Sequence, residues 1–264
     1  MSVNTSDPSA TPNRGPVQAP YPSPHPVPGQ APYPPVMGPA PTPSAVLRSP
    51  RGLATAVTVL LAVGAAVDLF SAGVNLYTRQ LMEDFGADPG SVEEDSLNLS
   101  DSLTAMTGIV QVAFRLATMV VFIIWFHRVR SNGQVFRPDG FTQSTGWAIG
   151  GWFVPIAQFF FPYRTARETW EASVQLAPDG SYRRVSNAPV TAWWLVFVAA
   201  MLIDRAFGSL YERAETAEEI GGASAVGAVS DLSAVVAAVL AFLFVRRLTA
   251  LQEIKAAQGP YAAV

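Results

Sequence analysis

Residues 146–163 read GWAIGGWFVPIAQFFFPY, and this stretch determines how many times the chain can cross a membrane. It is apolar enough to enter a bilayer, but its glycines and its two prolines, Pro155 and Pro162, make it a poor continuous helix. The arginines on its two flanks are Arg128, Arg130, Arg137, Arg164, Arg167, Arg183 and Arg184. Because basic loops tend to stay cytoplasmic, we expect the segment to enter the membrane and return to the same side.

The composition is that of an integral membrane protein. Half of the 264 residues are hydrophobic, 14% are charged, and the apolar residues fall in long blocks. Four blocks are long enough to cross about 30 Å of hydrocarbon as helices that rise about 1.5 Å per residue. They occupy residues 53–77, 103–126, 190–210 and 223–245. We therefore predict an all-α membrane domain over residues 51–250, with an interfacial or re-entrant segment at 146–163 between the second and third spans.

The distribution of basic residues favours four spans over five. With four spans and both termini cytoplasmic, 13 Arg or Lys lie on the cytoplasmic side and only Arg79 and Arg213 lie outside. If residues 146–163 also span, the division is 7 to 8, which shows no bias. Only the first arrangement obeys the positive-inside rule. The abundance of Ala, Gly, Pro and Arg fits a GC-rich bacterial genome, so we expect a multi-pass protein of a bacterial inner membrane.

The first 50 residues form a separate segment. They hold 15 of the 22 prolines and almost nothing that could build a core, which predicts a disordered cytoplasmic tail. The sequence APYP occurs in it twice, at 19–22 and 31–34. This repeat is typical of a docking tether for a cytoplasmic protein partner, or of a solvated spacer. Residues 251–264 are predicted to be a short C-terminal tail.

Five ionisable residues lie within the predicted spans, and they are Asp68, Arg115, Asp204, Arg205 and Asp231. The helical rise places Arg115 and the three aspartates at nearly one depth, about 17–21 Å from the cytoplasmic face. A charge that faces lipid is costly, so we expect a shared network with Arg115 as the partner of the carboxylates. The network would be a proton, ion or solute site, or an ionic cluster that fixes helix register. Nearby polar residues are Ser71, Asn75, Gln111 and Ser230.

The sequence lacks the residues that several kinds of functional site require. The absence of cysteine excludes disulfides, thiol catalysis and Cys-ligated metals. The acidic loops at 78–103 and 211–222 lack the spacing of a calcium-binding loop. No basic arm indicates a nucleic acid partner. We therefore assign no catalytic, cofactor-binding or metal-ligating residue, and expect a protein that is not an enzyme. A line of small residues, Ala223, Gly227 and Asp231, predicts close helix packing.

Two stretches resemble a known family. WFHRVRSN at 125–132 and GWAIGGWFVPIAQFFFPYRTARETWEAS at 146–173 are similar to the signature of an uncharacterised actinobacterial membrane family, known only as a domain of unknown function. The resemblance implies a small helical membrane domain preceded by a Pro-rich tail. That family has no established activity, so the resemblance implies no substrate.

The residues after Pro162 have the pattern of an amphipathic helix over 163–176. One face carries apolar residues, at Tyr163, Ala166, Trp170 and Val174. The other faces carry the i,i+4 pairs Arg164 with Glu168 and Arg167 with Glu171. We expect this helix to rest at the cytoplasmic interface. A basic collar would then contact membrane lipids or a partner, or serve only as a topology signal, and it consists of Arg128, Arg130, Arg164 and Arg167.

Two functions fit these features. The first is a non-enzymatic inner-membrane scaffold or interaction protein, in which the helices anchor while the tail and collar meet partners or lipid. The second is a small channel or transporter that uses the intramembrane charges with the 146–163 segment, since broken helices at membrane depth must be buried or line water.

Overall fold

The structure is a computed structural model that describes residues 47–177, 180–181 and 183–258. The chain divides into two units, residues 1–44 and 45–264. The first unit lies outside the described residues, and so does the predicted docking repeat. The helices of the second unit are α1 (Arg51–Ala87), η1 (Pro89–Ser91), α2 (Glu94–Phe136), α3 (Trp147–Gly150), η2 (Ala157–Phe159), α4 (Phe161–Ser173), α5 (Ala188–Tyr211) and α6 (Ala217–Ala257).

The predicted fold class is confirmed. Within the described ranges all regular elements are helices, and four of them, α1, α2, α5 and α6, are long and apolar enough to cross a membrane. All four are longer than the predicted spans, α5 by only two residues at its start and one at its end. The other three extend much further, because polar residues at their ends continue the helix beyond the apolar block. Residues 251–257, predicted as the start of a tail, belong to α6.

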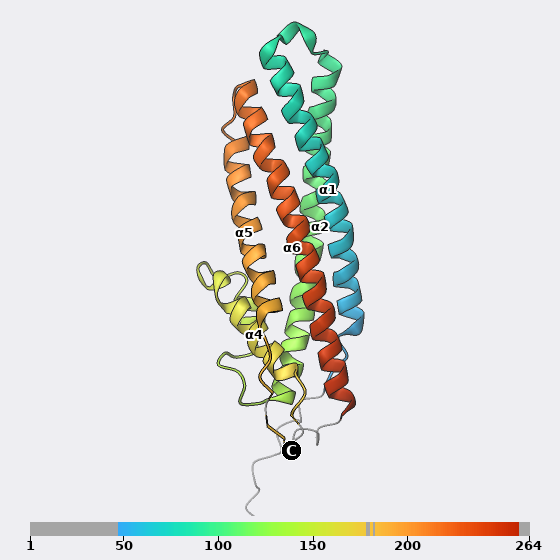
Figure 1. Ribbon diagram of the computed structural model, residues 1–264, viewed down its shortest axis with the longest axis vertical. Coiled ribbons are helices and arrows are strands. Elements are labelled where there is room, and N and C mark those ends of the chain that lie inside the picture. Colours follow the sequence, from blue (N-terminus) through green and yellow to red (C-terminus); the bar gives the residue numbers. More distant parts are fainter. Residues whose placement is uncertain (1–46, 178–179, 182, 259–264) are drawn as a thin grey trace, which may run out of the picture. The chain divides into compact units, whose positions relative to one another are not determined.

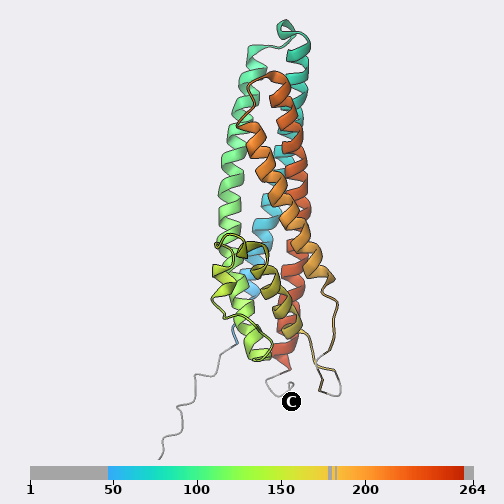
Figure 2. The same cartoon turned by 90° about the vertical axis from the view of Figure 1, so that its left-hand side faces the viewer.

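The four long helices form an up-and-down bundle (Figures 1 and 2). We call the end where α1 begins and α2 ends the lower end, as it is drawn in Figure 1. The short connections α1–α2 and α5–α6 lie at the upper end, and α3, η2 and α4 lie at the lower end. α1 packs along α6 and α2, and α5 packs along α6, whereas α2 and α5 have no comparable packing.

The segment at 146–163 returns to the end from which it starts, as predicted (Figure 1). It consists of α3, turns and η2, and its glycines and prolines prevent a longer helix. Ile156 has φ 67° and ψ −51°, and Ala157 N donates to Pro155 O over 2.8 Å. These values describe a γ-turn of the rare, strained kind.

The aromatic side chains of this segment point in two directions. Trp152 points inward, in edge contact with Phe122 and Trp194 at centroid distances of 5.7 and 6.0 Å. By contrast, Phe153 and Phe160 remain 62% and 64% exposed. Trp152 therefore helps to anchor the segment in the bundle, while other aromatic residues point outward, as in an interfacial segment.

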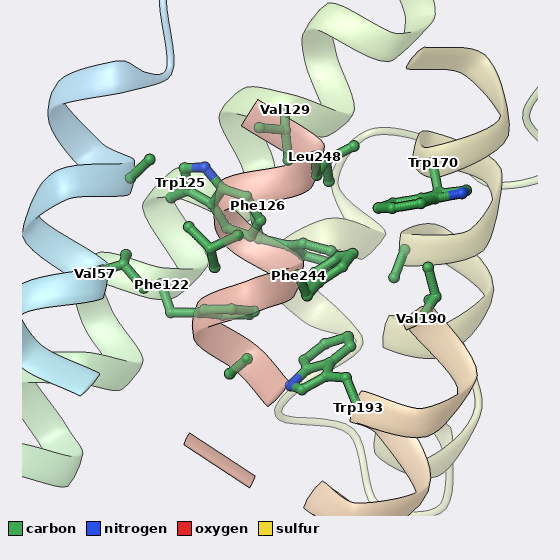
Figure 3. Close-up of a cluster of buried hydrophobic side chains, with 14 of the residues drawn as sticks. Val57, Phe122, Trp125, Phe126, Val129, Trp170, Val190, Trp193, Phe244 and Leu248 are labelled. Atoms are coloured by element: carbon green, nitrogen blue, oxygen red, sulfur yellow. The ribbon is translucent and has the colours of Figure 1, made fainter. Parts of the chain in front are cut away.

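An aromatic core fills the lower half of the bundle (Figure 3). Phe244 of α6 lies at its centre, stacked on Trp193 of α5 at a centroid distance of 4.5 Å. Trp125 of α2 meets the same ring edge-on at 5.8 Å, and Trp170 of α4 stacks on it at 6.4 Å. Each such pair contributes about 0.5–1.5 kcal/mol beyond the burial of its area. Phe244 thus joins α2, α4, α5 and α6 in one core.

The helix α4 is covered differently from the prediction. It begins two residues earlier and ends three residues earlier than the predicted range of 163–176. Its apolar residues Ala166 and Trp170 are buried in the core against α2 and α6, not laid on a lipid surface. An amphipathic pattern specifies an apolar face, but it does not specify whether lipid or protein covers that face.

Candidate functional site

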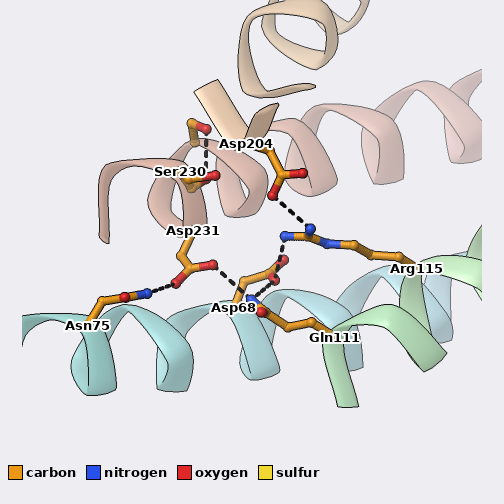
Figure 4. Close-up of polar contacts among 8 residues, drawn as sticks. Asp68, Asn75, Gln111, Arg115, Asp204, Ser230 and Asp231 are labelled. Atoms are coloured by element: carbon orange, nitrogen blue, oxygen red, sulfur yellow. Dashed lines mark hydrogen bonds and ion pairs between the residues drawn. The ribbon is translucent and has the colours of Figure 1, made fainter. Parts of the chain in front are cut away.

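The ionisable residues in the middle of the bundle meet in one network (Figure 4). Arg115 Nη1 on α2 lies 2.8 Å from Asp204 Oδ1 on α5. The other terminal nitrogen, Nη2, lies 3.7 Å from Asp68 Oδ1 on α1. One guanidinium therefore serves two carboxylates from two different helices, with the closer contact to α5.

Two amide side chains extend the network to α6. Gln111 Nε2 donates to Asp68 Oδ1 over 2.9 Å and to Asp231 Oδ1 over 2.8 Å. Asn75 Nδ2 donates to the other carboxylate oxygen of Asp231 over 2.9 Å. We call the whole set the polar layer, and it consists of Asp68, Asn75, Gln111, Arg115, Asp204 and Asp231.

The polar layer contains four of the five ionisable residues expected in the spans. Arg205 takes no part in it and is exposed. Successive residues of an α-helix project about 100° apart, so a helix that turns Asp204 inward turns its neighbour away. Gln111 and Asn75 connect the carboxylates, although the sequence indicated them only as nearby polar residues. Their spacing along the helices could have indicated this role, because it places each amide on the same helix face as a charged residue. Gln111 precedes Arg115 by four residues, and Asn75 follows Asp68 by seven.

A cavity of about 420 Å³ lies beside the polar layer. Asp68, Arg115 and Asp204 line it together with Gln111, and Trp152 and Gln158 of the α2–α5 connection also line it. The rest of its wall is mostly apolar and includes Phe114, Phe122, Met201, Trp193 and Phe197. The Arg115 and Asp204 side chains are 42% and 43% exposed, whereas that of Asp68 is 12% exposed. The Arg115–Asp204 pair thus borders the open side between α2 and α5.

The predicted basic collar is not a single surface. Arg130 is only 1% exposed, and its Nη2 donates to Gln143 O over 2.7 Å. Its guanidinium also lies 3.5 Å from the ring centre of Phe141, and burial lowers the pKa of this side chain, which lies beyond the predicted span. Arg128 donates to Ser49 O over 3.3 Å. Arg130 therefore holds the loop after α2 in place.

The other two collar residues lie on the exposed face of α4. Arg164 Nε lies 3.3 Å from Glu168 Oε1, and Arg167 Nε lies 3.7 Å from Glu171 Oε1. Both are the i,i+4 pairs that the sequence predicts. Glu168 is itself buried and accepts a hydrogen bond from Thr142 Oγ1 over 2.6 Å. The charged face of α4 is thus tied to the loop that precedes it.

A second buried polar network, which the sequence does not predict, lies at the lower end. Lys255 Nζ on α6 donates to Ala172 O over 2.8 Å and to Val174 O over 2.7 Å, which satisfies carbonyls at the end of α4. Burial, and then the charge of Arg137, lower the pKa of Lys255, which lies ten residues beyond the predicted end of its span at Val245.

Two amides complete this lower-end network. Gln252 Nε2 donates to Val129 O over 2.8 Å and to Ser173 Oγ over 3.1 Å. Asn132 Nδ2 donates to Gln252 Oε1 over 3.1 Å. Gln252 and Lys255 continue the helix face that carries Phe244 and Leu248, and this spacing is the signal that could have shown them to be buried.

The sequence of the helical domain matches a known family. Residues 88–250 match the model of the family described as Domain of unknown function (DUF4328). The chain belongs to the DUF4328 family. This confirms the predicted membership of an uncharacterised domain family. No curated protein and no solved structure matches the chain.

The DUF4328 match divides the polar layer. Four of its residues lie inside the match, and they are Gln111, Arg115, Asp204 and Asp231. The other two, Asp68 and Asn75, lie on α1, which ends before the match begins at residue 88. In the lower-end network, Asn132 and the end of α4 lie inside the match, whereas Gln252 and Lys255 follow its last residue. Among the residues that the structure describes, no group of three or more His, Cys, Asp or Glu side chains could hold a metal ion.

Proposed function

We propose that this DUF4328 protein is a non-enzymatic scaffold or interaction protein of a bacterial inner membrane, with both termini and the lower end in the cytoplasm. One observation carries the proposal. The α2–α5 connection is built as a fixed cap, because Lys255 and Gln252 bind the end of α4 and Arg130 binds the loop before it. These hydrogen bonds satisfy buried polar groups and hold the connection in one conformation, so that its outer face is a defined surface.

The cap offers a defined surface for a cytoplasmic partner. The arginines Arg164 and Arg167 are exposed on α4 and lie one turn apart. With the lower end in the cytoplasm, they would stand at the level of anionic lipid head groups and within reach of a cytoplasmic protein. The Pro-rich tail would be a second docking element for such a partner.

The test compares co-purifying proteins. The double variant R164Q/R167Q and a chain lacking residues 1–46 are each purified by affinity from the native membrane and analysed by mass spectrometry. We expect specific partners to be lost from one or both variants. Arg205→Gln is the matched control, because it removes an exposed arginine from α5, far from the cap. An unchanged partner list in both test variants contradicts the proposal.

A second candidate is a small channel or transporter, and the polar layer beside a cavity favours it. Charges at membrane depth are rare and mark solute or ion pathways in many membrane proteins. Asp68→Asn and Arg115→Leu are expected to abolish a flux in proteoliposomes while the protein still folds. The absence of flux under any applied gradient contradicts this candidate.

A further inference from the structure

The polar layer carries more negative than positive charge. Asp68, Asp204 and Asp231 are three carboxylates, and among the residues that the structure describes their one charged partner is Arg115, which lies close to Asp68 and Asp204. Gln111 and Asn75 donate hydrogen bonds but bring no charge. When all groups are ionised the layer has a formal charge of −2, from three negative charges and one positive. An uncompensated charge at this depth is costly, so a further positive charge is favoured.

The deficit faces the cavity. Asp231 does not line the cavity, and both of its oxygens accept amide hydrogen bonds. Asp68 and Asp204 do line it, and the guanidinium that lies between them holds Asp68 only at 3.7 Å. The place for an added cation is therefore the cavity side of Asp68 and Asp204.

The cavity walls select the kind of cation. A volume of about 420 Å³ is within the roughly 300–1,000 Å³ of cavities that bind drug-sized molecules. The walls are mostly aliphatic and aromatic, with the rings of Phe122, Trp152, Trp193 and Phe197 among them. Aromatic faces attract cations, and apolar walls favour an apolar body over a hydrated metal ion. The open side between α2 and α5 would face the bilayer, which gives an amphiphile a direct route in.

We infer that the cavity beside the polar layer binds a lipophilic organic cation, whose positive charge lies beside Asp68 and Asp204 and whose apolar body lies among the aromatic walls. This inference deepens the second candidate function, because such a cation would be the transported species. Binding does not itself require transport, so the two can be tested apart.

The test uses two ions of the same shape and opposite charge. Tetraphenylphosphonium and tetraphenylborate are titrated into the full chain in lipid nanodiscs, with empty nanodiscs as the measure of partition into lipid. We expect saturable, one-to-one binding of tetraphenylphosphonium beyond that of empty nanodiscs, and no saturable binding of tetraphenylborate. The tryptophan emission should be quenched in parallel, because Trp152 and Trp193 line the cavity.

Variants locate the site. Asp204→Asn and Asp68→Asn are each expected to weaken tetraphenylphosphonium binding by at least tenfold. Asp101→Asn, which neutralises an exposed carboxylate of α2 away from the layer, is the matched control and should bind as the wild type does. Thermal unfolding of each variant shows whether it folds, and the two carboxylates provide independent tests if one of them is needed for folding.

Each outcome has one meaning. Equal, unsaturable uptake of both ions overturns the inference in favour of lipid partition, and preferred binding of tetraphenylborate overturns it in favour of an anion at Arg115. Absence of tetraphenylphosphonium binding also overturns it, since a proton then meets the deficit. Saturable binding without flux in proteoliposomes supports the inference and removes only the transporter.

Discussion

Arg115 and Asp204 join α2 to α5 across the side of the bundle where the two helices scarcely pack, with 2.8 Å between Nη1 and Oδ1. The pair is at once a wall of the cavity and a bridge between the two helices that border it. Its geometry therefore affects both the stability of the bundle and the width of the opening.

A double-mutant cycle measures the bridge. Arg115→Gln and Asp204→Asn are each expected to lower the free energy of unfolding, and the double variant should lose less than the sum. We expect a coupling energy of about 0.6–1.7 kcal/mol, as for other polar contacts between membrane helices. Unfolding in mixed micelles provides the measurement. Strict additivity would show that the contact contributes nothing to stability.

The close approach of α6 to α1 and α5 makes Gly227 sensitive to any side chain. A Cβ at this position would lie 2.7 Å from Asn75 Oδ1 and 2.8 Å from Phe207 Cε2. Asn75 cannot easily move, because it donates to Asp231. We expect Gly227→Ala to destabilise the protein by about 1–3 kcal/mol in thermal or chemical unfolding.

Gly222 provides the control for that substitution. It lies on the same helix with nothing within 4 Å of its added Cβ. Gly222→Ala should therefore be neutral or stabilise the helix by about 0.5–1 kcal/mol. If both alanines have the same effect, packing at Gly227 is not the cause.

Lys255 makes the stability depend on pH. Its pKa is lowered in the folded chain from the ordinary 10.5, mainly by burial. Between the lowered value and 10.5 the unfolded chain binds more protons, so the free energy of unfolding rises with pH in that window, by up to about 1.4 kcal/mol per unit of pKa difference. Below the window the cost of burying the charge is fully present. The wild type should therefore gain stability relative to Lys255→Met as the pH rises towards 10.5, and parallel curves for the two proteins would refute the assignment.

Single cysteines test the topology, because the chain contains none of its own. Ser144→Cys and Ser181→Cys lie before and after the 146–163 segment, and both positions are exposed. With a membrane-impermeant thiol reagent, both should react only after cells are opened. Ser91→Cys at the upper end should react in intact cells. Labelling of Ser144→Cys and Ser181→Cys from opposite sides would mean that the segment crosses the membrane.

The sequence predicts the four long helices and the connection between α2 and α5 well. It predicts less well how the side chains between the helices are arranged. Apolar blocks and basic flanks predict four spans and a returning segment, because both follow from the cost of placing polar groups in lipid. The positions of Asp68 and Asp231 along their spans predict that the two carboxylates lie at the same depth. Which of two adjacent residues turns inward depends on the rotation of the helix about its axis. The sequence does not give that rotation, so it does not show that Asp204 joins the network and Arg205 does not.

The lower end shows why burial is harder to predict than span. Arg130 reads as a surface charge, yet Gln143 and Phe141 of the following loop surround it. Lys255 reads as part of a polar tail, yet it lies against the end of α4. In both cases the partner comes from a segment with a weak pattern of its own, so only the tertiary structure reveals the contact.

The length of α5 indicates where the bilayer surrounds the bundle. Its 24 residues measure about 36 Å, close to the roughly 30 Å of a hydrocarbon core, whereas the 43 residues of α2 measure about 65 Å. Among the four long helices, α5 is therefore the one whose full length matches the height at which lipid can surround the bundle. With the membrane midplane between Ala199 and Ala200, Asp204 lies about 7 Å above it. Long stretches of the other helices must then stand in water, and the cavity lies at the level where the two leaflets meet.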